Sequence, residues 1–172
     1  MGTLGLAFLL GLCLAACRGP GPGGTGQASS GLDGVAATLD AFHLAASQAD
    51  GEAYFALMAP DLVYLGTDRT ERWSREEFRA WAEPYFGSGR GWTYHVRRRH
   101  VALGAHGDVA WFDEELVNES YGDCRGTGVL RRAGGSWEIV QYNLALPVPN
   151  ELARDLVERV RALEPEPAPA SD

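Results

Sequence analysis

The segment Trp137-Glu-Ile-Val-Gln-Tyr-Asn143 decides the fold class, because apolar and polar residues alternate along it with the period of a β-strand. One face of this strand carries Trp137, Ile139, Gln141 and Asn143, and the other carries Val140, Tyr142 and Leu144. The same period extends back to Trp92, with hairpin turns expected at 104–107 and 133–135. Residues 92–146 therefore predict four long strands joined by hairpins.

The apolar face of the first of these strands changes phase. Trp92, Tyr94 and Val96 fall on one parity, whereas Val101 and Leu103 fall on the other. Because one extra residue in a strand restores the buried face, we predict a β-bulge across residues 97–99.

Helical patterns precede the sheet. Apolar residues recur at helical spacing at Leu32, Val35, Leu39, Phe42 and Ala46. A second short helix is expected at 54–58, a strand at 62–65, and a third helix after the capping box Ser74-Arg-Glu-Glu77. An amphipathic helix follows Asn150. This order predicts an α+β fold in which a curved, mostly antiparallel sheet wraps around N-terminal helices, with a C-terminal helix added.

The first seventeen residues predict an exported protein anchored to a membrane. The apolar run Leu4–Ala16 has the length of a secretory signal and is shorter than the roughly 20 residues of a spanning helix. Its end, Leu14-Ala-Ala-Cys17, resembles the lipobox of bacterial lipoproteins, which implies lipidation of Cys17 and a lipid anchor. The alternatives are a plain cleaved signal and an N-terminal helix with a chance cysteine. We expect a location in the bacterial cell envelope, favouring the outer membrane facing the periplasm, because Arg18 follows Cys17 in place of an aspartate.

The leader divides the chain into segments. We expect a signal peptide at 1–16, the lipidated cysteine and a Gly/Pro-rich tether at 17–31, one domain at 32–148, a C-terminal helix at 149–163 and a disordered tail at 164–172. The net charge is −8 and the chain has no lysine, which argues against a nucleic-acid partner. Cys124 has no partner cysteine once the leader is removed, so we expect no disulfide. No two histidines fall at close ligand spacing and the free thiol is alone, so we expect no metal site. We also expect no cofactor.

Several segments resemble the SnoaL-like branch of the nuclear transport factor 2-like superfamily. They are Ala49–Asp61, Leu65–Asp68, Glu71–Trp73, Ala110–Glu114, Arg125–Leu130 and Trp137–Asn143. The resemblance implies a cone-shaped α+β fold whose concave side lines a pocket and whose convex side often pairs with a second subunit. It does not assign a function, because the superfamily includes isomerases, cyclases, dehydratases and binding modules.

On this resemblance, Gln141 and Asn143 are expected in the pocket, and Val140, Tyr142 and Leu144 on the convex face of a homodimer. Many relatives have histidines where Gln141 and Asn143 stand here. Amide side chains can orient a carbonyl or hydroxyl but do not titrate, so proton transfer at these two positions is not expected.

Asp68 is a candidate general base, because a neighbouring Trp73 could raise the pKa of the carboxyl by excluding water. The alternative is that residues 66–68 form a turn in which Asp68 bonds its own backbone.

Acidic residues inside the strand at 109–119 supply further candidates. Asp113 and Glu115 share a face with Trp111 and could pair with Arg125 or His100 in a pocket. The alternatives are a cross-strand salt bridge or a solvated edge for the acids, and a structural role for His100.

Together these observations favour binding of a small apolar or amphipathic molecule, with no assigned reaction. The expected pocket residues are Tyr64, Trp73, Trp81, Trp111, Glu115, Arg125, Gln141 and Asn143. One alternative is an isomerase, cyclase or hydratase with Asp68 or Asp113 as base and His100, Arg125 or Asn143 stabilising an oxyanion. Another is a dimerising structural or interaction module.

Overall fold

A six-stranded mixed sheet forms one wall of the domain, and its strand order is β2-β1-β6-β5-β4-β3. The computed structural model describes residues 24–163, with side chains from residue 31 onward. The expected signal peptide, Cys17 and the tail lie outside the described residues. The strands are β1 Met58–Leu65, β2 Arg72–Ser74, β3 His95–Leu103, β4 Val109–Asn118, β5 Gly122–Ala133 and β6 Ser136–Ala145.

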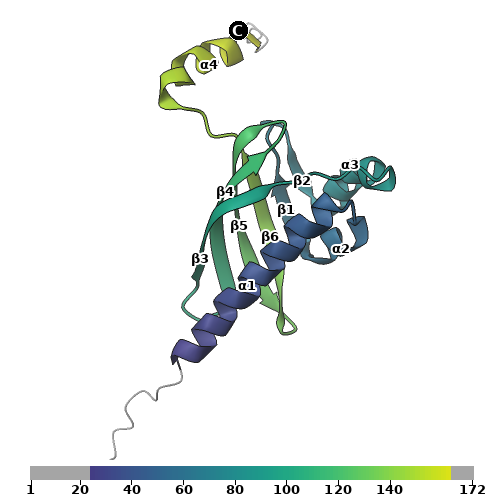
Figure 1. The fold of residues 1–172 in the computed structure, drawn as a ribbon, viewed down its shortest axis with the longest axis vertical. Helices are drawn as coiled ribbons and strands as arrows, with labels where there is room; N and C mark the ends of the chain where they lie inside the picture. The colour runs from purple at the N-terminus through teal and green to yellow at the C-terminus, as the bar shows by residue number, and fades with distance from the viewer. Residues whose placement is uncertain (1–23, 164–172) are drawn as a thin grey trace, which may run out of the picture.

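Three helices pack on one face of this sheet, and a fourth extends from its end (Figure 1). They are α1 Gly24–Ser47, α2 Gly51–Ala56, α3 Arg75–Gly87 and α4 Asn150–Leu163. The predicted α+β architecture with four long hairpin-connected strands is confirmed. All neighbouring strands are antiparallel except β1 and β6, which pair in parallel. Along the chain these two strands are separated by β2, α3, β3, β4 and β5.

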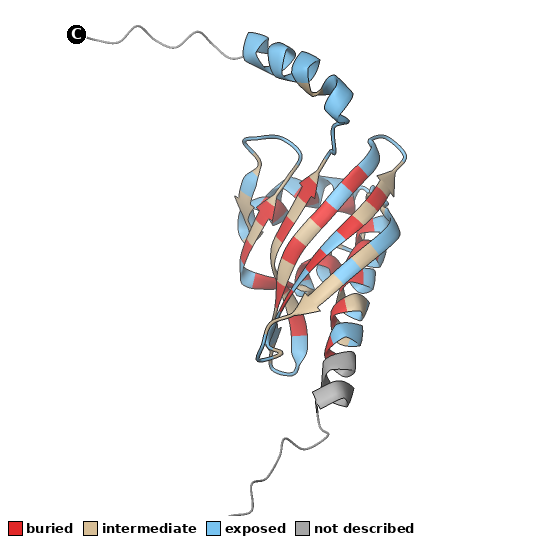
Figure 2. Ribbon diagram, turned by 90° about the vertical axis from the view of Figure 1, so that its left-hand side faces the viewer, coloured by how far each residue is buried: buried red, intermediate tan, exposed pale blue. Residues whose placement is uncertain are grey.

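Two of the register shifts in the sheet determine which side chains of β3 and β6 face the helices. The pairing of β3 with β4 shifts between Val96 and Arg98, which confirms the predicted bulge. A second shift lies in β6, where Ile139 and Gln141 pair with consecutive residues of β5 and Val140 is the extra residue. It reverses the parity of the strand, so Tyr142 and Leu144 are buried on the same side as Trp137 and Ile139 (Figure 2).

The core lies between this inner face and helices α1 to α3. Its largest fully buried apolar side chains are Leu39, Tyr54, Phe55, Leu62, Phe78, Leu116, Leu130, Ile139 and Tyr142. Burying an aliphatic or phenylalanine side chain contributes roughly 1.5–3 kcal/mol. The helices and the strands therefore depend on each other for stability.

Helix α1 begins at Gly24, inside the stretch expected to be a tether at 17–31. Two glycines of this helix lie against the sheet. A β-carbon on Gly34 would lie 3.1 Å from the indole of Trp137, and one on Gly31 would lie 3.1 Å from Leu103. Glycine at these positions lets α1 approach the sheet closely. The glycine-rich composition alone did not predict this helix packing.

Helix α4 has no buried residue (Figure 2). Its exposed apolar side chains are Leu152, Leu156, Val157, Val160 and Leu163. Among the described residues, no helix has both the length and the apolar character needed to cross a membrane.

Candidate functional site

An aromatic pocket opens between α3, the β1–β2 turn and the end of the sheet. The start of α3 is fixed by the predicted capping box, in which Ser74 Oγ accepts from the backbone N–H of Glu77 at 3.3 Å and Glu77 Oε2 accepts from the Ser74 N–H at 2.8 Å. This box orients the first turns of α3, so that Phe78 enters the core and Trp81 lies at the rim, 42% exposed.

The pocket has a volume of about 160 Å³, close to the roughly 150 Å³ of a cavity that holds benzene. It is lined by Tyr64, Gly66, Thr67, Glu71, Trp73, Phe78, Trp81, Trp92, Tyr94, Tyr121 and Leu144. The rings support one another: the centroids of Trp73 and Trp81 are 5.2 Å apart, and those of Trp81 and Trp92 are 5.9 Å apart. Such ring contacts stabilise the packing of the pocket walls.

The lining residues that carry polar side-chain groups are Glu71, Thr67, Tyr64, Tyr94 and Tyr121. Burial is the largest cause that raises the pKa of Tyr64, followed by the neighbouring Tyr94, with a smaller contribution from the charge of Glu71. Burial likewise raises the pKa of Tyr94. These two phenols therefore stay protonated at neutral pH and can donate hydrogen bonds.

The structure brings together three of the expected pocket residues. Tyr64 from β1, Trp73 from β2 and Trp81 from α3 all line this pocket. Trp73 stacks on Phe78 with an interplanar angle of 12°, and Tyr64 also stacks on Phe78, with ring centroids 3.7 Å apart.

Five other expected pocket residues lie on the outer face of the sheet. They are Trp111, Glu115, Arg125, Gln141 and Asn143. Trp111 is 52% exposed and Arg125 pairs in register with Glu115. Gln141 and Asn143 lie on the outer face because the bulge at Val140 turns their side chains away from the helices. Their expected place in the concave pocket was wrong, as was the convex place of Tyr142 and Leu144.

The three catalytic candidates also lie outside the pocket. Asp68 is exposed, and its Oδ1 accepts from the Thr70 N–H at 2.8 Å and from the Thr70 hydroxyl at 2.6 Å. These bonds lower the pKa of Asp68, opposite to the rise expected for a base, and match the turn interpretation. Asp113 and His100 are register partners on the exposed outer face.

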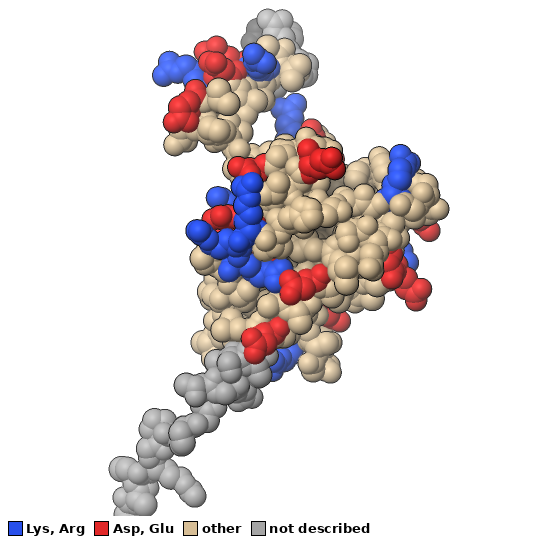
Figure 3. Space-filling view, in the orientation of Figure 1, with Lys and Arg blue, Asp and Glu red and all other residues tan. Residues whose placement is uncertain are grey.

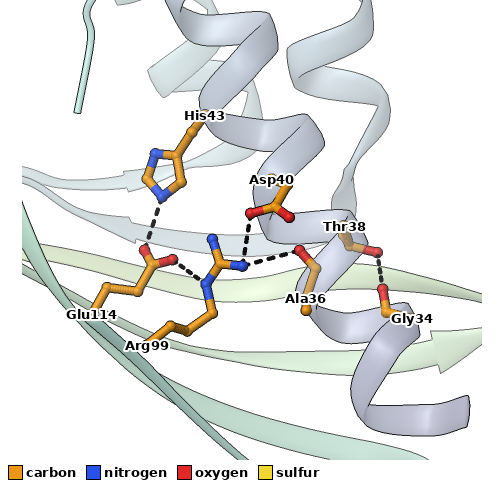
Figure 4. A network of polar contacts seen from close by, with 7 residues as sticks. All are labelled: Gly34, Ala36, Thr38, Asp40, His43, Arg99 and Glu114. Carbon is orange, nitrogen blue, oxygen red and sulfur yellow. Dashed lines mark hydrogen bonds and ion pairs between the residues drawn. The ribbon is translucent and has the colours of Figure 1, made fainter. Parts of the chain in front are cut away.

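Glu114, the neighbour of two candidates, is the acidic residue that points inward, and it is fully buried. Its Oε2 lies 2.8 Å from His43 Nε2, and its Oε1 accepts from Arg99 Nε at 2.6 Å (Figure 4). Arg99 Nη1 donates to the Ala36 carbonyl and to Asp40. Burial opposes the charge of Arg99, but Glu114 and Asp40 outweigh it and raise the pKa of the guanidinium. The network ties α1 to β3 and β4 without lining the pocket.

Sequence reasoning missed Glu71, Tyr94 and Tyr121 as pocket residues. Glu71 lies in the β1–β2 turn, Tyr94 precedes β3 and Tyr121 lies in the β4–β5 hairpin. No local pattern joins three loops that tertiary structure brings together. Glu114 did carry a signal, because its parity places a charge between the apolar Phe112 and Leu116.

Arginine side chains gather over β3, with acidic side chains close to them (Figure 3). Arg97 pairs with Asp123 at 2.8 Å and Arg98 with Glu115 at 3.4 Å. Arg99 is held by Glu114 and Asp40. The positive charge of this run is thus balanced locally by carboxylates.

A family model described as "SnoaL-like domain" matches residues 35–149. No curated protein matches the chain in sequence.

Solved structures share this fold at low sequence identity. An NTF2-like protein of unknown function from Pseudomonas putida KT2440 is 20% identical, with a TM-score of 0.60 over 72% of this chain and 91% of that one. A "putative dehydratase from the NTF2-like family" of Streptomyces avermitilis is 15% identical, with a TM-score of 0.60 over 71% and 99%. A "Putative Scytalone Dehydratase" from Novosphingobium aromaticivorans is 12% identical, with a TM-score of 0.61 over 72% and 89%. These likenesses establish the NTF2-like fold.

Proposed function

Because the chain belongs to the SnoaL-like domain family, we propose that its aromatic pocket binds a small apolar or amphipathic molecule. The observation that carries this proposal is a cavity of about 160 Å³ with mostly aromatic walls and a few polar groups. Small-molecule sites have this composition, since apolar walls supply affinity and a few polar groups fix orientation.

The dehydratase names of two structural relatives are consistent with a pocket for small organic molecules. We assign no reaction to this chain. Asp113 and His100 lie on the outer face of the sheet, and the Asp68 carboxylate is held by Thr70, so none of the three candidate bases lines the pocket.

The test is native mass spectrometry of the full-length chain purified from its host. We expect a bound small molecule in the wild-type protein and in Trp111→Ala, which changes an exposed outer-face residue. We expect the bound mass to be lost in Trp81→Ala, because Trp81 lines the pocket rim. A ligand retained equally by both variants would place the site elsewhere.

We also propose that the protein is held at the bacterial cell envelope by lipid on Cys17, favouring the outer membrane. The support is the apolar leader that ends in Leu-Ala-Ala-Cys. Stable anchoring needs more than one acyl chain, and Cys17 would carry these chains. Loss of the cysteine should therefore release the protein. A Cys17→Ser variant that stays in the membrane fraction would contradict the anchor.

The outer face of the sheet is our proposed homodimer surface. A hollow there is lined by Val63, Leu65, Arg72, Val129, Val140 and Gln141, and the exposed Trp111 extends its apolar part. Exposed apolar patches on soluble domains commonly mark interfaces. The same mass spectra report the oligomeric state, and we expect Trp111→Arg to shift it toward the monomer.

A nucleic-acid partner is not proposed. The run Arg97–Arg99 is paired with Asp123, Glu115, Glu114 and Asp40, and the net charge of the chain is −8. Binding to phosphates needs free clustered positive charge.

A further inference from the structure

Among the residues that the structure describes, the lining of the aromatic pocket contains one formally charged side chain, and that charge is negative. Seven of these lining residues are aromatic, Glu71 is acidic, and none of them is arginine, lysine or histidine. We propose that the ligand is an organic cation of the alkylammonium type, which rests on the proposed function of the same pocket.

The Glu71 carboxylate is held in place at the pocket wall. Its Oε2 accepts from the Asp68 N–H at 3.1 Å, and the backbone carbonyl of Glu71 accepts from the Gly66 N–H at 2.9 Å. A β-carbon on Gly66 would overlap Glu71 Oε2, so glycine at this position admits the carboxylate. The β1–β2 turn therefore fixes the position of this negative charge.

Filling the pocket removes water from Glu71. A buried carboxylate without a counter-charge or sufficient donors is strongly unfavourable. A neutral apolar ligand would impose that cost, and an anion would add repulsion to it. A cationic headgroup avoids both, because it replaces the lost hydration of Glu71 with an opposite charge.

The walls suit the same ligand. Tryptophan and tyrosine rings attract cations through the negative charge of their faces, and cages of such rings recognise quaternary ammonium groups. A trimethylammonium group is comparable in size to benzene, for which the cavity volume is adequate. The arginines that lie over rings contact Phe55, Tyr85 and Trp137, which are not among the lining residues.

Isothermal titration calorimetry on the full-length chain tests the proposal with two probes of the same shape. Choline carries a trimethylammonium group, and 3,3-dimethylbutan-1-ol replaces its nitrogen with carbon and so lacks the charge. We expect choline to bind at least about tenfold more tightly than the neutral isostere. Both probes keep the hydroxyl, so a difference between them reports the charge alone.

Two pairs of variants locate the effect. Glu71→Gln keeps an oxygen that can accept from Asp68, and we expect it to reduce the preference for choline to about twofold or less. Glu76→Gln removes an exposed acid that does not line the pocket and should keep the full preference. Trp81→Leu should weaken choline binding, whereas Trp111→Leu should not. Thermal unfolding confirms that each variant is folded.

Equal binding of choline and its isostere by the wild-type chain would overturn the cationic class and leave the pocket function intact. Failure of both probes to bind would also overturn it. The native mass spectra then decide separately whether the pocket holds another molecule, so the two proposals fail in distinguishable ways.

Discussion

The carboxylate of Glu114 lies at the centre of the domain with a histidine on one side and an arginine on the other. Adjacent Glu115 faces out and contacts Arg98 at 3.4 Å on the surface. Two neighbouring glutamates thus experience opposite environments, because successive side chains of a strand point to opposite faces. The surroundings of each residue determine what its charge contributes.

We predict that Glu114→Ala lowers the free energy of unfolding by about 3–5 kcal/mol, because the variant removes the buried counter-charge of Arg99 and the hydrogen-bond partner of His43 Nε2. Glu115→Ala should change it by about 1 kcal/mol or less, as expected for a surface pair. Urea unfolding followed by circular dichroism measures both values. Similar losses for the two variants would contradict a structural role for the buried network.

Gly66 is a second residue with a defined task, since it makes room for the Glu71 carboxylate. We predict that Gly66→Ala displaces this carboxylate and breaks its hydrogen bond with the Asp68 N–H. Hydrogen exchange at the Asp68 amide should then accelerate. Gly87→Ala is the control, because a β-carbon there meets no atom within 4 Å. Unchanged exchange at Asp68 would show that the turn does not depend on Gly66.

Among the elements, strands β3 and β6 each contain a bulge, but only the first could be predicted. In β3 the apolar residues themselves change parity between Val96 and Val101. In β6 the change of parity is followed by Gln141 and Asn143, whose amide side chains are compatible with either face of the sheet. Tyr142 and Leu144 suit an interface as well as a core, so packing against the helices was needed to assign them.

The pocket residues that could be predicted are those that lie close together along the chain. Tyr64, Trp73 and Trp81 were identified because β1, β2 and α3 follow one another along the chain. Tyr94 and Tyr121 reach the pocket from the segment before β3 and from the β4–β5 hairpin, which follow later in the chain. The resemblance to a family predicted the cone-shaped fold. The bulge at Val140 determines that Gln141 and Asn143 lie outside it.

Helix α4 contributes no buried side chain, so its apolar residues should tolerate substitution. We predict that Leu156→Ala changes the free energy of unfolding by less than about 0.5 kcal/mol. The same substitution at Leu130, which is fully buried in β5, should cost about 2–5 kcal/mol. Denaturant unfolding of both variants checks this. A large loss at Leu156 would mean that α4 packs against the domain in solution.

At the scale of the whole molecule, the interior of the cone is rich in tyrosine. Burial is the main cause that raises the pKa of Tyr54, Tyr64, Tyr94 and Tyr142 in the folded state. In the unfolded chain these phenols titrate near pH 10. The unfolded state therefore loses protons first, so stability is fully present below about pH 10 and falls as the pH rises above it.

We predict that these four tyrosines ionise only as the protein unfolds. Tyrosinate absorbance and near-ultraviolet circular dichroism, recorded together during an alkaline titration, should show a coincident transition. Complete ionisation of all six tyrosines while the fold persists would contradict the buried interior.

The central claim is that ligands enter the aromatic pocket and not the outer face, and the indole N–H signals of the five tryptophans test it most directly. The full-length chain would be titrated with phenyltrimethylammonium, which has both a ring and a cationic group, in two-dimensional proton–nitrogen spectra. We predict that the signals of Trp73, Trp81 and Trp92 shift, while those of Trp111 on the outer face and Trp137 in the core do not. A shift of Trp111 with the three pocket tryptophans unchanged would contradict the claim.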